Sequence, residues 1–260
     1  MGTASATFGE RLRGGDRRAL ARAISLVERG DPGVPELLEG AAAGRRERPA
    51  VGITGAPGAG KSTLVDALIA RARERERTVG VIAVDPSSPL TGGALLGDRV
   101  RMHRHALDPG VFVRSMGARG HAGGLAAATE AALLLMGAAG FDEVIVETVG
   151  VGQSDHAVTA LVATSVLVLS PGAGDLIQLQ KAGIMEVADV YVVNKGDLDG
   201  APALLRDLRR VVGRARPDGW VPPVLGTIAN QPDDSQLALW EAVDAHRRHL
   251  GSGLLTGTTL

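Results

Sequence analysis

Gly55-Ala-Pro-Gly-Ala-Gly60-Lys61-Ser62 is the stretch of the sequence that decides the fold. Its glycines, lysine and serine have the spacing of a phosphate-binding loop, G-x-x-x-x-G-K-S. The apolar run 50–54 just before it predicts a β-strand, and the run 61–76 predicts a helix. A glycine-rich turn that matches the pattern by chance is the alternative. Because a strand precedes the loop and a helix follows it, the context favours a phosphate-binding loop.

The chemistry of this loop assigns a role to each of its parts. Backbone N–H groups turn toward the β-phosphate, and the helix N-terminus adds a partial positive charge. We expect Lys61 to reach the β- and γ-phosphates and to act in catalysis, and the Ser62 hydroxyl to bind Mg²⁺. The predicted nucleotide-binding residues of the loop are Gly55, Ala56, Pro57, Gly58, Ala59, Gly60, Lys61, Ser62 and Thr63.

Strands and helices alternate along the chain beyond this loop. Continuous Val, Ile and Leu runs are typical of strands buried on both faces, so we expect a mostly parallel sheet covered by helices on both faces. The sequence therefore predicts an α/β fold of the P-loop NTPase type. Predicted strands cover 50–54, 79–84, 110–114, 143–147, 165–170, 189–193 and 223–229, and predicted helices cover 61–76, 122–138, 154–163, 175–186, 200–214 and 234–250.

Three regions are expected along the chain. Residues 1–48 form a short N-terminal helical segment, in which Asp16 is a candidate N-cap and Gly30 a candidate helix end. A further short helix is expected after Pro35. Residues 49–250 form one α/β domain that carries the phosphate-binding loop, and the Gly/Ser/Thr-rich stretch 251–260 is predicted to be a flexible tail.

A second short segment, Asn194-Lys195-Gly196-Asp197, follows the predicted strand 189–193. Ligands bind at the carboxyl ends of the strands in open α/β sheets. The Asp197 carboxylate can accept hydrogen bonds from N1–H and the N2 amino group of guanine, a pair that adenine does not offer. Asn194 can hold the loop and guanine N7, and the Lys195 stem can cover the ring. Taken by itself, a cluster of Asn, Gly and Asp after a strand is more often only a turn. With a phosphate-binding loop upstream, it predicts GTP and GDP as the bound nucleotides.

Three carboxylates are candidates for binding Mg²⁺ or its waters. Asp85 and Glu147 each end an apolar run that predicts a buried strand, and Asp98 lies in a Gly-rich stretch. Each could instead cap the helix that follows, an alternative that fits Asp98 best. We expect Glu147 and Asp98 to act in catalysis together with Lys61.

The segment after Glu147 is predicted to respond to the nucleotide. Gly150 would present its backbone N–H to the γ-phosphate, so 148–155 is a candidate switch. Val151 follows at the position where a Ras-like GTPase places the glutamine that orients the attacking water, and Gln153 lies two residues further on. The sequence therefore predicts slow GTP hydrolysis that accelerates when a partner orders the switch.

Five longer segments are similar to the MeaB/ArgK family of GTPases. One of them is Val84-Asp-Pro-Ser-Ser-Pro-Leu-Thr-Gly-Gly93, which continues to residue 102 and resembles that family's first switch. The resemblance runs from about residue 10 to about residue 250, and the other four segments are 114–125, 147–154, 171–183 and 186–195.

Members of that family are GTPase chaperones of adenosylcobalamin-dependent acyl-CoA mutases, chiefly methylmalonyl-CoA mutase. They gate cofactor loading and protect the mutase, and the resemblance implies the same activity and partner here. It implies that Asp85, Asp98 and Glu147 are Mg²⁺-linked acids and that 178–181 belong to a third switch. Methylmalonyl-CoA and isobutyryl-CoA mutases are equally compatible with the sequence. Family members continue beyond residue 250 into a helical arm that builds a homodimer, so a homodimer stays an open expectation.

Three other functions compete with this one. A P-loop kinase or ATPase linked to amino-acid transport would need a phosphoacceptor site, and the sequence indicates none. A metal-delivery GTPase would carry Cys or clustered His ligands, but there is no cysteine and His103, His105 and His121 are irregularly spaced. We expect His121 to lie in a switch or the core, and the other two to be solvated. A scaffold with an inactive nucleotide site is disfavoured by the set of Lys61, Ser62 and Glu147.

Composition excludes several further classes. A formal net charge of −1 and 2% aromatic residues argue against a nucleic-acid partner. The longest apolar stretch, 157–169, is interrupted by Thr and Ser and is too short to span a bilayer, so no membrane is expected. The N-terminus lacks the apolar core of a signal peptide, and we expect a cytoplasmic protein.

Overall fold

The structure is a computed structural model that describes residues 8–42, 50–85, 103–117, 122–148, 160–172, 188–231 and 233–256. Its centre is a seven-stranded sheet with the order β3-β2-β4-β1-β5-β6-β7, in which all neighbouring strands are parallel. The predicted α/β fold of the P-loop NTPase type is confirmed. The strands are β1 (Val51–Gly55), β2 (Val79–Asp85), β3 (Val111–Gly117), β4 (Glu143–Thr148), β5 (Thr164–Leu169), β6 (Val190–Val193) and β7 (Val224–Gly226).

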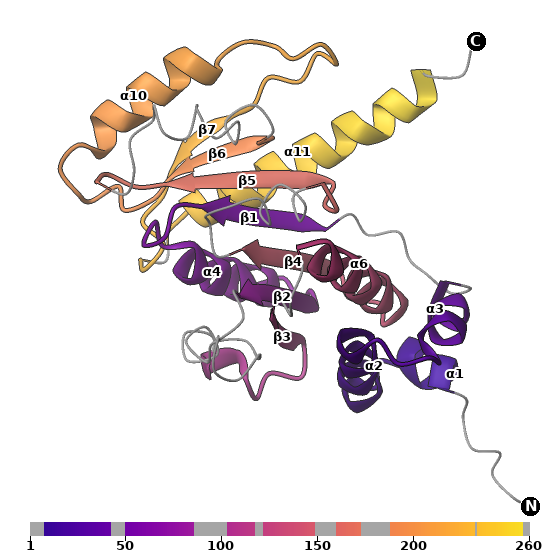
Figure 1. Cartoon of the computed structure of the whole chain (residues 1–260). Coiled ribbons are helices and arrows are strands. Elements are labelled where there is room, and N and C mark those ends of the chain that lie inside the picture. Colours follow the sequence, from indigo (N-terminus) through magenta and orange to yellow (C-terminus); the bar gives the residue numbers. More distant parts are fainter. Residues whose placement is uncertain are drawn as a thin grey trace, which may run out of the picture.

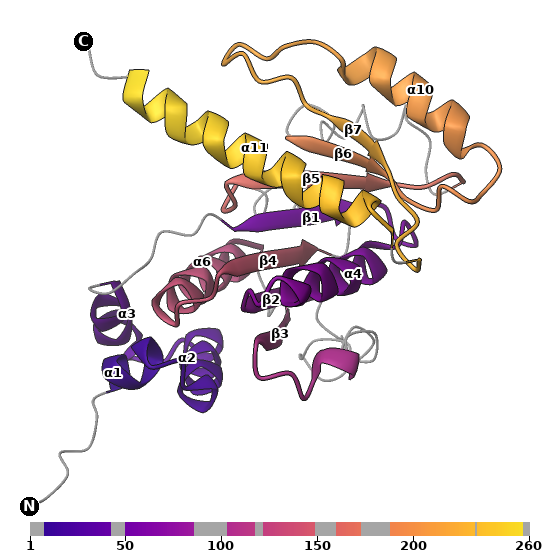
Figure 2. The same cartoon turned by 180° about the vertical axis from the view of Figure 1, so that it is seen from behind.

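Helices cover both faces of the sheet, as predicted (Figure 1). Figure 2 shows α4 and α11 in front of the sheet and α6 behind it. Strand side chains alternate between the two faces. Thus Val166 lies in one core cluster with α4 and α11, whereas Leu167 lies in another with α10. The helices that flank the sheet are α4 (Lys61–Glu74), α6 (Ala122–Ala138), α10 (Ala201–Val212) and α11 (Ser235–Thr256).

The N-terminal helices α1 (Phe8–Arg13), α2 (Arg17–Arg29) and α3 (Val34–Ala42) pack beside α6 (Figure 1). Both predicted ends of α2 are confirmed. Asp16 Oδ1 accepts hydrogen bonds from the backbone N–H groups of Arg18 and Ala19, and Gly30 adopts the left-handed conformation with φ 65°. The buried stripe of α2 shares one core cluster with α6, so the helical segment is joined to the sheet by apolar packing. The predicted boundary at residues 48 and 49 lies outside the described residues.

Two predicted elements extend further along the chain than expected. The strand predicted to end at residue 114 continues to Gly117, because β3 pairs with β2 along its whole length, up to Asp85 opposite Gly117. The helix predicted to end at residue 250 continues to Thr256, so the predicted tail begins with helical residues. Glycine weakens a helix by about 1 kcal/mol, but leucine is among the best helix formers, and two leucines follow Gly253.

The helix predicted over 154–163 is also wrong where the structure describes it. Residues 160–163 form turns and bends rather than a helix. The backbone N–H of Ala163 donates to the carbonyl of Ala50 at 3.1 Å, so the chain is already pairing with the residue before β1. The helix predicted over 175–186 lies outside the described residues, as does the predicted third switch.

Candidate nucleotide-binding site

The loop between β1 and α4 requires glycine at both of its ends. Gly55 and Gly60 have φ values of 142° and 91°, a range that favours glycine. A Cβ atom added to Gly55 would lie 2.0 Å from the carbonyl oxygen of Val168, and one added to Gly60 would lie 2.3 Å from Asn194 Nδ2. The loop is therefore pressed against β5 on one side and against the Asn194 loop on the other.

Lys61 begins α4, and its side chain turns back over the loop. The residue is only 7% exposed, and its Nζ atom donates hydrogen bonds to the carbonyls of Gly55 at 2.9 Å and Ala56 at 3.1 Å. The ammonium group is thus held at the loop itself, beside the helix N-terminus, where an anion is stabilised by both charges.

The second residue of α4 meets the end of β4. Ser62 Oγ donates a hydrogen bond to Glu147 Oε1 at 2.5 Å, and both residues are buried. The backbone of Asp85 ends β2, the strand next to β4, where Val84 lies opposite Thr148. Three predicted magnesium residues therefore lie at one edge of the sheet. Asp98, the other predicted magnesium residue, and Gly150, whose N–H is predicted to face the γ-phosphate, lie outside the described residues.

Asn194 joins three loops by its side chain. Its Nδ2 group donates to the carbonyl of Ala59 at 2.9 Å. Its Oδ1 atom accepts from the Thr227 hydroxyl at 3.1 Å and from the Ala229 N–H at 3.0 Å. The residue is 2% exposed. The phosphate-binding loop, the Asn194 loop and the loop after β7 are therefore fixed relative to one another.

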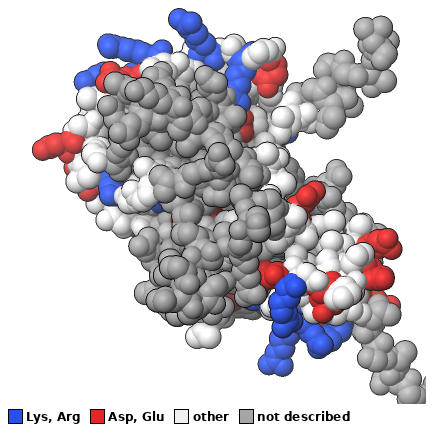
Figure 3. All heavy atoms as spheres, viewed as in Figure 1, with Lys and Arg blue, Asp and Glu red and all other residues white. Residues whose placement is uncertain are grey.

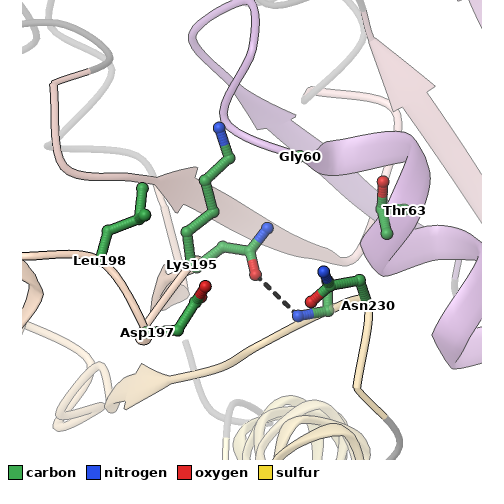
Figure 4. A pocket seen from close by; sticks show the side chains of 8 residues that line it. Gly60, Thr63, Lys195, Asp197, Leu198 and Asn230 are labelled. Atoms are coloured by element: carbon green, nitrogen blue, oxygen red, sulfur yellow. Dashed lines mark hydrogen bonds between the residues drawn. The ribbon is translucent and has the colours of Figure 1, made fainter.

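These three loops enclose a pocket of about 190 Å³. Figure 4 shows the Lys195 side chain extending toward the phosphate-binding loop, and the Asp197 carboxylate facing into the space before Asn230. Lys195 has a φ of 58°, which turns the chain at the end of β6. The pocket is lined by Gly60, Thr63, Asn194, Lys195, Asp197, Leu198, Ala229 and Asn230.

Sequence reasoning missed Leu198, Ala229 and Asn230 as pocket residues. The signal was available, because Ala229 ends the last predicted strand, Asn230 follows it, and the carboxyl ends of parallel strands meet at one edge. The predicted strand 223–229 was too long, because β7 ends at Gly226. The Thr227 N–H donates a hydrogen bond to the carbonyl of Val193 at 2.9 Å as the chain turns over the pocket.

The expectation that His105 is solvated is wrong. His105 is buried, and its Nε2 atom lies 3.1 Å from Asp66 Oδ1 on α4. Within the described ranges, no three His, Asp or Glu side chains gather in a way that could hold a metal ion.

The described surface offers little else that points to a ligand. On the face in Figure 3, basic side chains gather over α10, and charges of both signs lie over the N-terminal helices. Arg209 and Arg210 lie in the last turn of α10, where a cation complements the helix dipole. Among the helices that the structure describes, none combines the length and the apolar character needed to cross a membrane.

Several curated proteins are similar to this chain over most of its length. A protein of Pyrococcus abyssi that is provisionally named a GTPase is 49% identical over 245 residues, covering 93% of this chain and 75% of that protein. The GTPase ArgK of Escherichia coli is 42% identical over 224 residues, covering 83% and 68%. A fused isobutyryl-CoA mutase of Cupriavidus metallidurans is 39% identical over 256 residues, covering 94% of this chain but 23% of that protein.

Solved structures agree with the fold. A crystal structure named as an LAO/AO transport system kinase superposes with a TM-score of 0.76 at 30% identity, covering 97% of this chain and 79% of that one. HypB from Helicobacter pylori, in complex with nickel, has a TM-score of 0.55 at 16% identity, which supports the fold alone.

A family model described as methylmalonyl Co-A mutase-associated GTPase MeaB matches residues 20–258. The chain therefore belongs to the MeaB family of methylmalonyl-CoA mutase-associated GTPases.

Proposed function

We propose that this protein hydrolyses GTP to GDP and phosphate, and that it acts as a GTPase chaperone of an adenosylcobalamin-dependent acyl-CoA mutase. The observation that carries the nucleotide assignment is the Asn194 side chain, which bonds the phosphate-binding loop to the loop after β7. Since Asn194 itself begins the guanine-reading segment, one rigid unit can recognise both ends of GTP.

The phosphate end of GTP lies, in this proposal, over the loop 55–60. Lys61 Nζ exchanges the Gly55 and Ala56 carbonyls for oxygens of the β- and γ-phosphates. The loop N–H groups and the N-terminus of α4 add fixed partial charges that stabilise the phosphates without reorganising. Lys61 therefore stabilises the negative charge that shifts toward the leaving GDP during hydrolysis.

The residues at the start of α4 and the end of β4 fit a magnesium ion. Mg²⁺ prefers hard oxygen ligands and usually keeps several waters. The Ser62 hydroxyl and the Glu147 carboxylate supply such oxygens from a buried position at the edge of the sheet. We propose that these two residues hold the ion or its waters, together with Asp85 and Asp98. When bound, Mg²⁺ neutralises charge on the phosphates.

The base end of GTP fits the pocket beside Asp197. We propose that the Asp197 carboxylate accepts hydrogen bonds from N1–H and from the N2 amino group of guanine. The stems of Lys195 and Leu198 offer apolar surface to the ring, and both side chains line the pocket. Selectivity for guanine over adenine follows, because adenine presents no paired donors to a carboxylate.

Slow turnover is part of the proposal. Val151 stands where a Ras-like GTPase places its water-orienting glutamine, and we propose that a partner completes the site by ordering 148–155, with the Gly150 N–H sensing the γ-phosphate. A mutase is the partner that the family description names. The Cupriavidus relative supports this class of partner, because its name gives a fused isobutyryl-CoA mutase.

Nucleotide selectivity and catalysis test the core of the proposal. Phosphate release is measured with GTP and with ATP, each with Mg²⁺, for the natural chain and for Lys61→Ala. The proposal expects release from GTP but not from ATP, and loss of release in the variant. A phosphotransferase linked to transport is the second candidate, because a similar solved structure carries a kinase name. Preference for ATP would favour that candidate and contradict ours.

A further inference from the structure

The carboxylate of Asp66 on α4 binds the chain that follows the predicted first switch. The short helix η1 (His103–His105) begins immediately after residue 102. Arg104 binds Asp66 through both ends of its guanidinium group: Nε to Oδ1 at 2.8 Å and Nη2 to Oδ2 at 2.6 Å. Arg104 Nη2 also donates to the Asp66 carbonyl at 3.0 Å. His105 Nε2 reaches the same carboxylate at 3.1 Å.

Asp66 lies close to the nucleotide pocket as well. It stands one helical turn beyond Ser62 and Thr63 on α4, so these residues share one side of the helix. Asp66 and Arg104 line a groove that also includes Thr63, Ala229 and Asn230, and those three residues line the nucleotide pocket too. The Asp66–Arg104 pair therefore lies one helical turn from Ser62 and Thr63, in a groove that shares three lining residues with the nucleotide pocket.

A second tie lies further along the same segment. Arg73, two turns beyond Asp66 on α4, donates a hydrogen bond to Asp108 Oδ2 at 2.9 Å and holds the pKa of Asp108 below its usual value. Arg17 of α2 donates to the Asp108 carbonyl at 3.1 Å. Residues 103–108 are thus attached to α4 at two separate points, of which only the Asp66 tie lies beside the nucleotide pocket.

We propose that Asp66 is a positioning residue for GTP hydrolysis: by holding Arg104 and His105, it sets where the chain leaves the first switch relative to the phosphate-binding loop. This inference rests on the proposed GTPase function. Asp98 lies six residues before Arg104, a span of at most about 20 Å of extended chain. Without the Asp66 tie, the next residue bound to α4 is Asp108, ten residues from Asp98, and the maximum reach rises to about 34 Å.

The test compares three variants of the full chain with the natural protein. Asp66→Ala removes the carboxylate, and Arg104→Ala removes its main partner from a half-exposed position. Glu74→Ala is the matched control, because it removes an ion pair with Arg71 from the same helix and the same groove. Single-turnover GTP hydrolysis, GDP affinity and amide hydrogen exchange of 86–102 with a non-hydrolysable GTP analogue are measured for each.

The inference expects Asp66→Ala to lower the hydrolysis rate roughly tenfold, since a small misplacement of catalytic groups has effects of this size or larger. GDP affinity should stay within about twofold, because the pocket itself is intact. Amides of 86–102 should exchange faster in Asp66→Ala and Arg104→Ala but not in Glu74→Ala. The hydrolysis rate of the double variant should fall by less than the two single effects combined, because both changes break the same contact between the Asp66 carboxylate and the Arg104 guanidinium.

Equal hydrolysis and equal exchange in Asp66→Ala and Glu74→Ala would overturn the inference. If Asp66→Ala does not fold, Arg104→Ala decides the matter by the same two readouts. A natural chain that binds GTP without hydrolysing it would refute the proposed function, and this inference with it. An active natural chain with unaffected variants would refute only the inference.

Discussion

Replacing Asn194 by alanine should destabilise the protein even without nucleotide. The change removes the Nδ2 donor to Ala59 and the Oδ1 acceptor for Thr227 and Ala229. All three contacts are buried, so the partners lose their hydrogen bonds where water does not replace them. Each such loss costs about 1 kcal/mol, which gives about 3 kcal/mol in the free energy of unfolding. For a chain of this size, the midpoint temperature should fall by roughly 6–12 °C.

Urea unfolding of the nucleotide-free chain measures this free energy. Asn230→Ala is the matched control, because Asn230 lines the same pocket but is exposed, and its change should stay within about 0.5 kcal/mol. GDP should also stabilise Asn194→Ala less than the natural protein, since the loops that bind its two ends are no longer fixed together. If Asn194→Ala were no more destabilising than Asn230→Ala, the role of Asn194 as the link between the loops would be refuted.

Three further predictions follow from single residues. Asp197→Asn should weaken GDP binding roughly 100-fold and strengthen binding of xanthosine diphosphate, because an amide can donate to the xanthine 2-oxo group; isothermal titration with both nucleotides checks the exchange. Gly60→Ala should abolish GDP binding because its Cβ atom would lie 2.3 Å from Asn194 Nδ2, whereas Gly58→Ala meets no atom within 4 Å and should only add backbone strain. Burial lowers the pKa of His246 below its ordinary value of 6.5, so the unfolded chain binds a proton first; stability present above pH 6.5 should fall as the pH drops toward the lower folded pKa. His246→Gln should remove that part of the pH dependence in urea unfolding at pH 7.5 and 5.5, and an unchanged dependence would contradict the assignment.

Local sequence patterns predicted the features that depend on neighbouring residues. The glycines of the phosphate-binding loop, the Asp16 cap and the Gly30 helix end each follow from backbone chemistry within a few positions. The order of strands and helices follows from runs of apolar residues, because a parallel sheet needs strands that are buried on both faces.

Features that depend on distant partners could not be predicted in the same way. Asn194 was predicted to hold its loop, but its bond to Ala59 joins residues 135 positions apart and exists only once β1 and β6 are aligned with β5 between them. His105 was expected to be solvated, yet it is buried beside Asp66, a residue 39 positions earlier in the sequence. The end of α11 was placed too early because glycines were weighed without the leucines that follow them.

GTP turnover with Mg²⁺, by the chain alone and with an adenosylcobalamin-dependent acyl-CoA mutase from the same source, tests the central claim most directly. The proposal predicts slow turnover by the chain alone and a severalfold rise when the mutase is added. Brisk turnover by the chain alone, or turnover that no such mutase changes, would contradict it.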